Sequence, residues 1–213
     1  MTRLSFNISM SLDGFITGPD PGPEQPLGAG GEQLHEWGVK LASWREAHGL
    51  EGGEVSADSE VLEETMSAAG STIMGRSMFG GEEGPWGDDP WQGWWGEEPP
   101  FGVPVFVLTH HPREPLVLKG TTFTFVTDGI ESALDQAKAA AGDRDVALAG
   151  GADVFQQYLG AGLVDEFQLH VVPLLLGDGV RLFDDGAGAG VQVEPDRVIE
   201  SPAVTHIRYR VVK

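Results

Sequence analysis

Residues 145–159 read DVALAGGADVFQQYL, and this stretch decides the fold. It begins with an apolar run, Val146–Ala149, that has the length of a buried strand. Gly150 and Gly151 follow directly. The next apolar residues recur at helical spacing: Val154, Phe155, Tyr158 and Leu159. The stretch therefore predicts a strand, a double-glycine turn and a helix.

The double glycine has two interpretations. Two glycines between a strand and a helix let the backbone approach a ligand and leave amide N–H groups without partners at the helix start. Such a helix start is a natural binding site for phosphate. Alternatively, the glycines only permit the strand and the helix to pack closely. The stretch alone leaves both interpretations open, because it lacks the complete G-x-G-x-x-G dinucleotide pattern.

Composition limits the classes of protein to consider. With 213 residues, 40% of them hydrophobic, we expect a single domain over residues 1–213. The formal net charge of -20 argues against nucleic acid as a partner, because a basic surface is needed to displace counterions from phosphates. No apolar run is long enough for a membrane span and the N-terminus is unlike an export signal, so we expect a cytoplasmic protein. The absence of cysteine excludes disulfides and thiol catalysis.

The order of the elements predicts an α/β fold. Strands are expected at 4–10, 71–74, 103–109, 123–127 and 146–149, and helices at 32–47, 56–69, 128–141 and from 152 onward. Ser56 is expected to cap its helix, and residues 128–131, DGIE, have a capping-box pattern. Only strand patterns follow, at 163–176, where we expect a break near Pro173, and at 191–199 and 203–212. This order indicates a central, mainly parallel sheet with flanking helices and C-terminal antiparallel strands.

Two aromatic segments are open to more than one interpretation. Trp37 and Leu41 lie on one stripe of the predicted helix 32–47, where they either pack in the core or face a ligand. Residues 80–102 hold four tryptophans among glycines, prolines and acids, and cannot form a regular element. These tryptophans are expected to fold back onto the body, cover a pocket or meet another subunit, because water disfavours their exposure.

Three predicted strands end in groups that suit a phosphorylated ligand. The turns are Gly75-Arg76-Ser77, Thr109-His110-His111 and Gly150-Gly151. Parallel strands place their carboxyl ends at one edge of the sheet, where ligands bind in α/β folds. Arg76 could hold a phosphate with a bidentate fork, and Thr109 and His110 could donate further hydrogen bonds. With Arg113, these groups would give an anionic ligand a locally positive pocket in an acidic protein.

Other chemistries have little support in the sequence. It has no H-E-x-x-H motif and its six histidines are scattered, so no metal site is expected. The G-x-S-x-G elbow of serine hydrolases and the Walker sequence are also absent. His170, within an apolar strand, is expected to be a core or rim histidine, and Asp178 a turn residue.

Several motifs, in order along the chain, resemble those of the dihydrofolate reductase-like superfamily. They are Ser11–Gly14, Thr72–Ser77 (TIMGRS), Val105–His110 (VFVLTH), Ala149–Phe155 (AGGADVF), and Leu163–Glu166 leading to Pro173–Gly177 (PLLLG). The chain looks closest to proteins related to the reductase domain of the bifunctional riboflavin-biosynthesis deaminase–reductase. The matching motifs cover most of residues 4–183.

This resemblance implies an NADPH-dependent reductase that is often a homodimer. Gly75, Arg76 and Ser77 would meet the cofactor's phosphates, with Thr109 and His110 by the adenosine 2′-phosphate. The double glycine and the residues after it would complete the cofactor site at the pyrophosphate: Gly150, Gly151, Ala152, Asp153, Val154 and Phe155. Asp13 and Gly14 would border the nicotinamide. The helix that carries Trp37 and Leu41 would line the substrate pocket.

The sequence departs from the family pattern in places that bear on the substrate. Dihydrofolate reductases carry an acid in the substrate-lining helix, whereas residues 32–47 offer only Glu36 and Glu46, neither clearly on the apolar stripe. Met78 stands where a hydroxyl residue is usual. We expect no deaminase domain before these motifs. The resemblance therefore implies neither folate nor the riboflavin-pathway substrate.

We therefore expect NADPH-dependent transfer of a hydride to a C=N or C=O group of a small organic molecule, such as a pteridine- or pyrimidine-like compound. Asp13 is the candidate catalytic acid, and the alternative is a turn aspartate that caps a strand end. A non-catalytic ligand-binding protein on the same scaffold is the second hypothesis. A flavin-linked oxidoreductase is the third.

Overall fold

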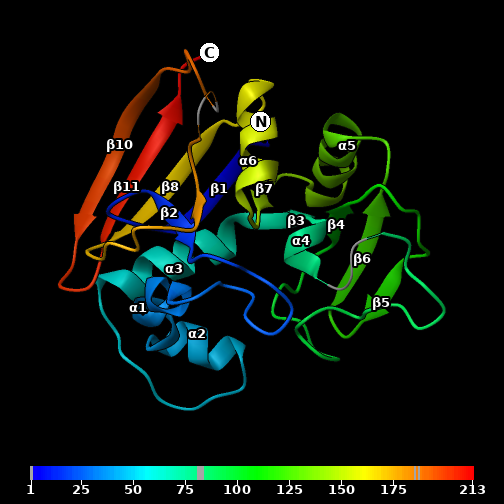
Figure 1. The fold of residues 1–213 in the computed structure, drawn as a ribbon, viewed down its shortest axis with the longest axis horizontal. Helices are drawn as coiled ribbons and strands as arrows, with labels where there is room; N and C mark the ends of the chain where they lie inside the picture. The colour runs from blue at the N-terminus through cyan, green and yellow to red at the C-terminus, as the bar shows by residue number, and fades with distance from the viewer. Residues whose placement is uncertain (1, 81–83, 185, 187) are drawn as a thin grey trace.

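A mixed sheet forms the centre of the structure, a computed structural model that describes residues 2–80, 84–184, 186 and 188–213. Within these residues nine strands pair in the order β10-β11-β8-β1-β7-β3-β4-β6-β5 (Figure 1). Six neighbouring strands are parallel: β8 (Glu166–Val172), β1 (Leu4–Ser11), β7 (Asp145–Leu148), β3 (Ala69–Gly75), β4 (Val105–Leu108) and β6 (Thr121–Val126). The strands at the two edges pair antiparallel with their neighbours. They are β11 (Thr205–Val211) and β10 (Val193–Glu200) on one side and β5 (Leu116–Leu118) on the other. The expected mainly parallel sheet with C-terminal antiparallel strands is confirmed.

Helices cover both faces of this sheet (Figure 1). One face carries α5 (Ile130–Ala141) and α6 (Ala152–Gly160). The other carries the 3-10 helix η1 (Gly31–Leu34), α1 (Glu36–Val39), α2 (Ala42–Ala47) and α3 (Ala57–Ala68), while the short α4 (Arg76–Phe79) directly follows β3. None of the helices in the described ranges is both long and apolar enough to cross a membrane.

Strand β1 shows how alternating residues serve the two faces. Phe6 points toward α6, where its ring stacks on Phe155 with centroids 4.2 Å apart. Ser9 points to the opposite face, where its hydroxyl oxygen accepts a hydrogen bond from the indole N–H of Trp37 at 3.1 Å. The face under α5 and α6 is therefore the main apolar core, and the face under α1 and α3 carries polar side chains.

The single helix expected over residues 32–47 is wrong. The chain forms η1, α1 and α2 there, with Leu41 in an extended conformation between the last two (φ −73°, ψ 144°). The backbone beside Leu41 pairs with Glu54: the Ala42 N–H donates to Glu54 O at 2.9 Å, and the Glu54 N–H donates to Lys40 O at 2.9 Å. This tertiary pairing takes backbone groups that a continuous helix would use, so it overrides the helical pattern.

Three further details differ from the sequence expectations. The strand expected over 163–176 begins later, since β8 starts at Glu166, whereas its expected break near Pro173 is confirmed, because β8 ends at Val172. The capping box expected at 128–131 is wrong: Gly129 is the N-cap of α5 and no side chain caps it. The structure also contains a small second sheet, which the sequence did not predict, in which β2 (Phe15–Thr17) pairs with β9 (Val180–Arg181).

The expected cap of α3 is confirmed and can be tested. Ser56 Oγ accepts from the Asp58 N–H at 3.2 Å, and Ser59 Oγ accepts from the Ser56 N–H at 3.1 Å. Ser56→Ala should lower the free energy of unfolding in urea by about 1 kcal/mol, because it leaves a helix-start N–H unpaired. Ser67→Ala, on the exposed end of the same helix, is the control and should change it by less than about 0.5 kcal/mol. Equal losses in the two variants would contradict the capping role.

Candidate cofactor and active site

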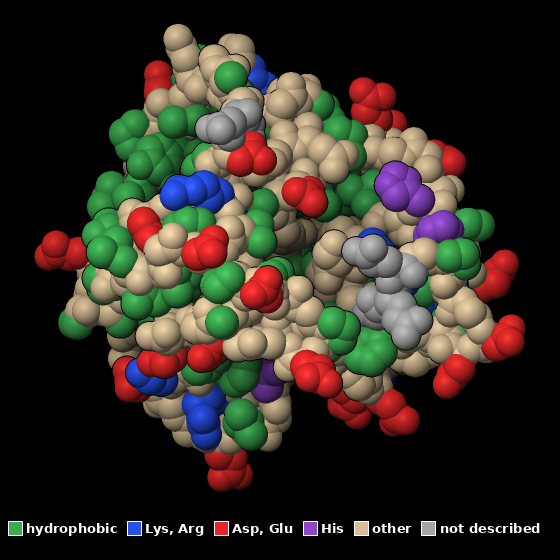
Figure 2. All heavy atoms as spheres, viewed as in Figure 1, with side chains coloured by type: hydrophobic (Ala, Val, Ile, Leu, Met, Phe, Trp, Pro, Cys, Tyr) green, Lys and Arg blue, Asp and Glu red, His purple; other side chains and the backbone are tan. Residues whose placement is uncertain are grey.

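Two of the predicted ligand turns meet at the carboxyl ends of β3 and β7. These parallel strands are neighbours, and the Ala149 N–H donates a hydrogen bond to Ile73 O at 2.8 Å. Only glycine fits at position 75, because a Cβ there would lie 2.7 Å from Val154 Cγ2 in the first turn of α6. Gly150 has φ +133°, a conformation that favours glycine. Figure 2 shows the surface hollowed near the centre of this face, close to α4 and α6.

The start of α6 presents backbone N–H groups at this edge. Gly151 is the N-cap, and no side chain caps the helix. Within the described ranges, the N–H groups of Ala152, Asp153 and Val154 have no hydrogen-bond acceptor. A Cβ added to Gly151 would meet no atom within 4 Å, so the space beside the turn is open. This arrangement suits a phosphate group.

The side chains of α6 are divided between core and solvent. Those of Ala152, Val154 and Phe155 are buried, so these residues can offer a ligand only their backbone. The Asp153 side chain is exposed and lines an open hollow with Asp184. Its negative charge stabilises the start of the helix, and its side chain faces the solvent.

The third predicted turn follows β4, beside β3. Gly75 lies opposite Leu108 in the register, so Arg76 and Thr109 leave the sheet side by side. Thr109 is buried, its N–H donates to Val126 O at 3.1 Å, and its Oγ1 accepts from the His111 N–H at 3.2 Å. Its hydroxyl thus closes the turn. His110 is exposed at the tip.

Two guanidinium groups lie on one indole next to this turn. Arg76 Cζ is 3.2 Å and Arg113 Cζ 4.7 Å from the ring centroid of Trp86. The Trp86 indole N–H donates to His111 O at 2.9 Å, and Arg113 Nη1 donates to Trp91 O at 2.6 Å. Burial lowers the pKa of Arg76, and the nearby positive charge of Arg113 lowers it further. Two like charges this close favour a bound anion. Ser77, by contrast, is exposed on α4.

The tryptophan-rich residues 84–102 fold back onto the body of the protein and contain no helix or strand. The indole N–H groups of Trp91 and Trp94 donate to Phe79 O and Met78 O, at 2.9 and 3.0 Å, and so cap the end of α4. Trp95 packs on Phe123, with ring centroids 5.9 Å apart. These contacts favour the packing interpretation, and Trp86 adds a cover over Arg76.

Asp13 ties the end of β1 to the loop after β8. Its carboxylate accepts hydrogen bonds from Ser11 Oγ at 2.6 Å, the Leu176 N–H at 3.1 Å and the Gly177 N–H at 2.7 Å. The Ser11 bond lowers the pKa of Asp13, and the backbone bonds lower it further. A carboxylate with a lowered pKa holds its negative charge rather than donating a proton. The structure therefore favours the alternative role for Asp13, as a turn residue, over that of a catalytic acid.

Trp37 and Leu41 are buried in one apolar cluster with Leu34, Val172 and Val204. Trp37 retains 8% of its surface exposed and Leu41 1%. Both therefore pack in the core in this structure, and a role in substrate binding stays a prediction.

Sequence reasoning missed a buried polar group beside Trp37. His170 Nδ1 and His206 Nδ1 are 2.6 Å apart, and His206 Nε2 lies 2.9 Å from Asp58 Oδ1. The buried carboxylate belongs to Asp58 in the first turn of α3, a position where acidic residues also occur because they interact favourably with the helix dipole. In the described ranges no cluster of three or more His, Cys, Asp or Glu side chains could hold a metal ion.

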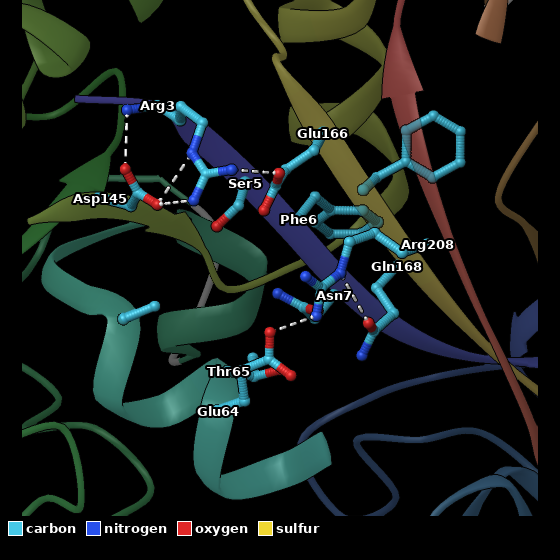
Figure 3. Close-up of a pocket in the computed structure, with 12 residues that line it drawn as sticks. Arg3, Ser5, Phe6, Asn7, Glu64, Thr65, Asp145, Glu166, Gln168 and Arg208 are labelled. Atoms are coloured by element: carbon cyan, nitrogen blue, oxygen red, sulfur yellow. Dashed lines mark hydrogen bonds and ion pairs between the residues drawn. The ribbon is translucent and has the colours of Figure 1, made fainter. Parts of the chain in front are cut away.

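A small polar pocket lies between α3 and strands β1, β8 and β11 (Figure 3). Its cavity volume is about 50 Å³. Arg3 pairs with Asp145 and Glu166, both at 2.7 Å, and Arg208 pairs with Glu64 at 2.8 Å. These ion pairs satisfy the pocket's main charges, and the volume suits a few water molecules. Because Arg3 lies at the start of β1, the pocket is at the opposite end of the sheet from the glycine turns.

Comparison with known proteins decides the family. The family model described as "RibD C-terminal domain" matches residues 2–206. The chain belongs to the RibD C-terminal domain family. It is also similar to the uncharacterized protein YyaP of Bacillus subtilis, with 39% identity over 61 residues. That match spans 29% of this chain and 32% of YyaP, about a third of the relative's length.

Solved structures show the fold of this RibD C-terminal domain. A putative riboflavin biosynthesis protein from Shewanella sp. PV-4 matches it with a TM-score of 0.65 and 20% identity over 100% of both chains. Dihydrofolate reductase from Enterococcus faecalis, complexed with NADP(H), matches with a TM-score of 0.51 and 14% identity, over 99% of this chain and 97% of that enzyme. The expected dihydrofolate reductase-like fold is confirmed.

The role of Asp13 as an ionised turn residue has a pH signature. Its pKa is lowered in the folded protein, so its stabilising contribution is present above the ordinary aspartate pKa of about 3.9 and disappears as the pH falls through the lower folded value. Asp13→Asn should therefore lower the melting temperature at neutral pH, and its difference from the wild type should shrink on acidification. Asp128→Asn is the exposed control. A difference that stays constant with pH would contradict this role.

Proposed function

We propose that this protein is an NADPH-dependent reductase that transfers a hydride to a C=N or C=O group of a small organic substrate, such as a pteridine- or pyrimidine-like compound. The observation that carries the proposal is the convergence of three turns at the carboxyl ends of three adjacent parallel strands, β7, β3 and β4. Membership of a reductase-domain family supports the same chemistry.

The residues at this edge fit the anionic part of the cofactor. The N–H groups at the start of α6 point into open space and can donate to a pyrophosphate. Arg76 and Arg113 add positive charge beside the end of β4, although the whole chain has a net charge of -20. Figure 2 shows acidic side chains spread over the same face, so positive charge here is a local feature that favours an anion at this edge.

The protein's own groups would bind and orient rather than react. NADPH, when bound, supplies the hydride. The Asp13 carboxylate fixes the loop at Leu176 and Gly177 relative to the end of β1, and it keeps a negative charge there. In the proposed site this charge would stabilise the positive nicotinamide that forms when the hydride leaves.

A ligand-binding protein without reductase activity is the second candidate. Trp86 lies over the Arg76 guanidinium, and Met78 Sδ would be 3.2 Å from a Cβ at Gly150, so both side chains reduce the space beside the phosphate turns. This candidate predicts that neither NADPH nor NADH binds.

Titration of the unmodified protein with NADPH and NADH separates the two candidates, and substitution of Arg76 tests the phosphate site. Arg76→Ala should weaken NADPH binding at least about tenfold, roughly 1.4 kcal/mol, and NADH binding much less, because NADH lacks the 2′-phosphate. Isothermal titration calorimetry measures both affinities without relying on tryptophan fluorescence, which loss of the Arg76–Trp86 contact would disturb. Arg144→Ala removes an exposed arginine elsewhere and should change neither affinity. Equal losses for NADPH and NADH would contradict a role for Arg76 at the 2′-phosphate.

A further inference from the structure

The last two strands of the sheet carry a face that no helix covers. On the side of α6, that helix reaches only as far as β8, where the ring centroids of Phe155 and Phe167 are 5.6 Å apart. Among the described residues, no helix lies over β11 and β10 on this side (Figure 1). Every residue of β10 is exposed except Ile199, which is half-buried. A sheet face ordinarily packs against a second layer, and here that layer is missing.

The side chains on this face are apolar. His206 and Arg208 of β11 point toward α3, with which both form hydrogen bonds. Ile207 and Tyr209 therefore point toward the side of α6. The Tyr209 ring lies on that side, 5.3 Å from Phe167. The register with β10 completes a set of six residues, the hairpin face, which consists of Val193, Pro195, Val198, Ile207, Tyr209 and Val211.

The hairpin face is open to solvent. Val198 is 61% exposed and Val193 38%, and the other four residues are exposed or half-buried. Figure 2 shows hydrophobic side chains gathered over β10 and β11. Single apolar residues on a surface need no explanation, but a contiguous group of this kind marks an interaction site.

The charges of the hairpin say which partner fits. None of the six residues is charged, although the chain has a net charge of -20. The arginines of the hairpin pair with carboxylates: Arg197 and Arg208 with Glu64, and Arg210 with Asp196. The hairpin face thus has no charge with which to attract a basic or an acidic partner, so its partner must offer an apolar surface. A second copy of this chain offers one of matching size, and a two-fold axis requires only one such patch on each copy.

The outer edge of β10 is built against a different contact. Pro195 has no N–H to donate, and the register with β11 shifts between Pro195 and Arg197. Proline and a bulge are features by which edge strands avoid pairing with a further strand. Contact is therefore expected through the hairpin face and not by extension of the sheet.

The total surface is large enough to lose an interface. The chain exposes 11280 Å². A monomeric protein of its mass, 22.7 kDa, exposes about 9,500 Å² by the usual scaling of area with mass. The excess is roughly 1,700 Å², and a standard interface takes about 800 Å² from each partner. Burial of one such face would bring the chain toward the area of an ordinary folded protein.

We propose that the hairpin face is the interface between two copies of this chain, related by a two-fold axis. The two hairpins pack face to face, as the sheets of a sandwich do, about 10 Å apart. The proposed cofactor site contains none of the six residues, so the interface does not depend on the proposed reductase function.

The mass of the whole protein in solution tests the interface. Sedimentation at micromolar concentration should give about twice the 22.7 kDa of one chain. Val198→Lys should give the mass of one chain, because the contact would bury an unpaired charge. Val55, 84% exposed ahead of α3, provides the matched control, and Val55→Lys should remain a dimer. A monomeric wild-type protein, or a dimer that survives Val198→Lys, would overturn the proposal.

A thiol probe covers the case in which Val198→Lys does not fold. The chain has no cysteine, so Val198→Cys carries a single thiol and keeps the face small and apolar. Its reaction with a maleimide should be about tenfold slower in concentrated protein, nine-tenths dimeric, than in protein diluted to monomer. The thiol of Val55→Cys should react at one rate throughout. A rate for Val198→Cys that does not change with protein concentration would count against the interface.

Salt distinguishes apolar association from ion pairing. Two copies that each carry a net charge of -20 repel one another, and salt screens this repulsion without weakening apolar contact. The dissociation constant of the dimer should therefore fall as NaCl rises from about 0.05 to about 0.5 M. A dissociation constant that rises with salt would indicate an interface of ion pairs and contradict the hairpin face.

These measurements use no NADPH, so the two proposals can fail separately. A protein that dimerises through the hairpin face but binds no NADPH keeps the interface and loses the reductase function. A protein that binds NADPH as a monomer keeps the reductase function and loses the interface.

Discussion

The close contact between the end of β3 and the first turn of α6 determines the geometry of the whole site. Gly75 has no side chain, so Val154 can lie against the strand end, and α6 begins directly beside it. The first N–H groups of α6 and the side chain of Arg76 therefore lie at the same edge of the sheet. Any larger residue at position 75 would force the Val154 side chain to shift. Gly150, just after β7, takes a backbone conformation that favours glycine, with φ +133°.

Around this contact the protein uses aromatic rings to place positive charge in an acidic chain. Arg113 lies near Trp86 and Phe125 and donates to a backbone carbonyl, and in the described ranges no carboxylate pairs with it. Rings hold a guanidinium without neutralising its charge. The tryptophan-rich segment thus contacts both arginines through Trp86 and caps the end of α4 through Trp91 and Trp94.

The sequence predicted the features that depend on local pattern. The strand–glycine–helix unit at 145–159, the cap at Ser56 and the final antiparallel strands follow from periodicity and turn chemistry. It could not predict the break at Leu41, because the backbone of Glu54 competes for the hydrogen bonds there. Nor could it predict the contacts of His206 with His170 and Asp58, because these residues come from two strands and a helix and meet only in the folded structure. His170 is buried, as expected for a core histidine.

Hydrogen–deuterium exchange with and without NADPH tests the central claim most directly, because it reports where the cofactor meets the backbone. The account predicts slower exchange at residues 75–77 and 150–154 on binding, with the small pocket around Arg3 and Arg208 unchanged. Protection confined to that pocket, or no protection at either glycine turn under saturating NADPH, would contradict the account.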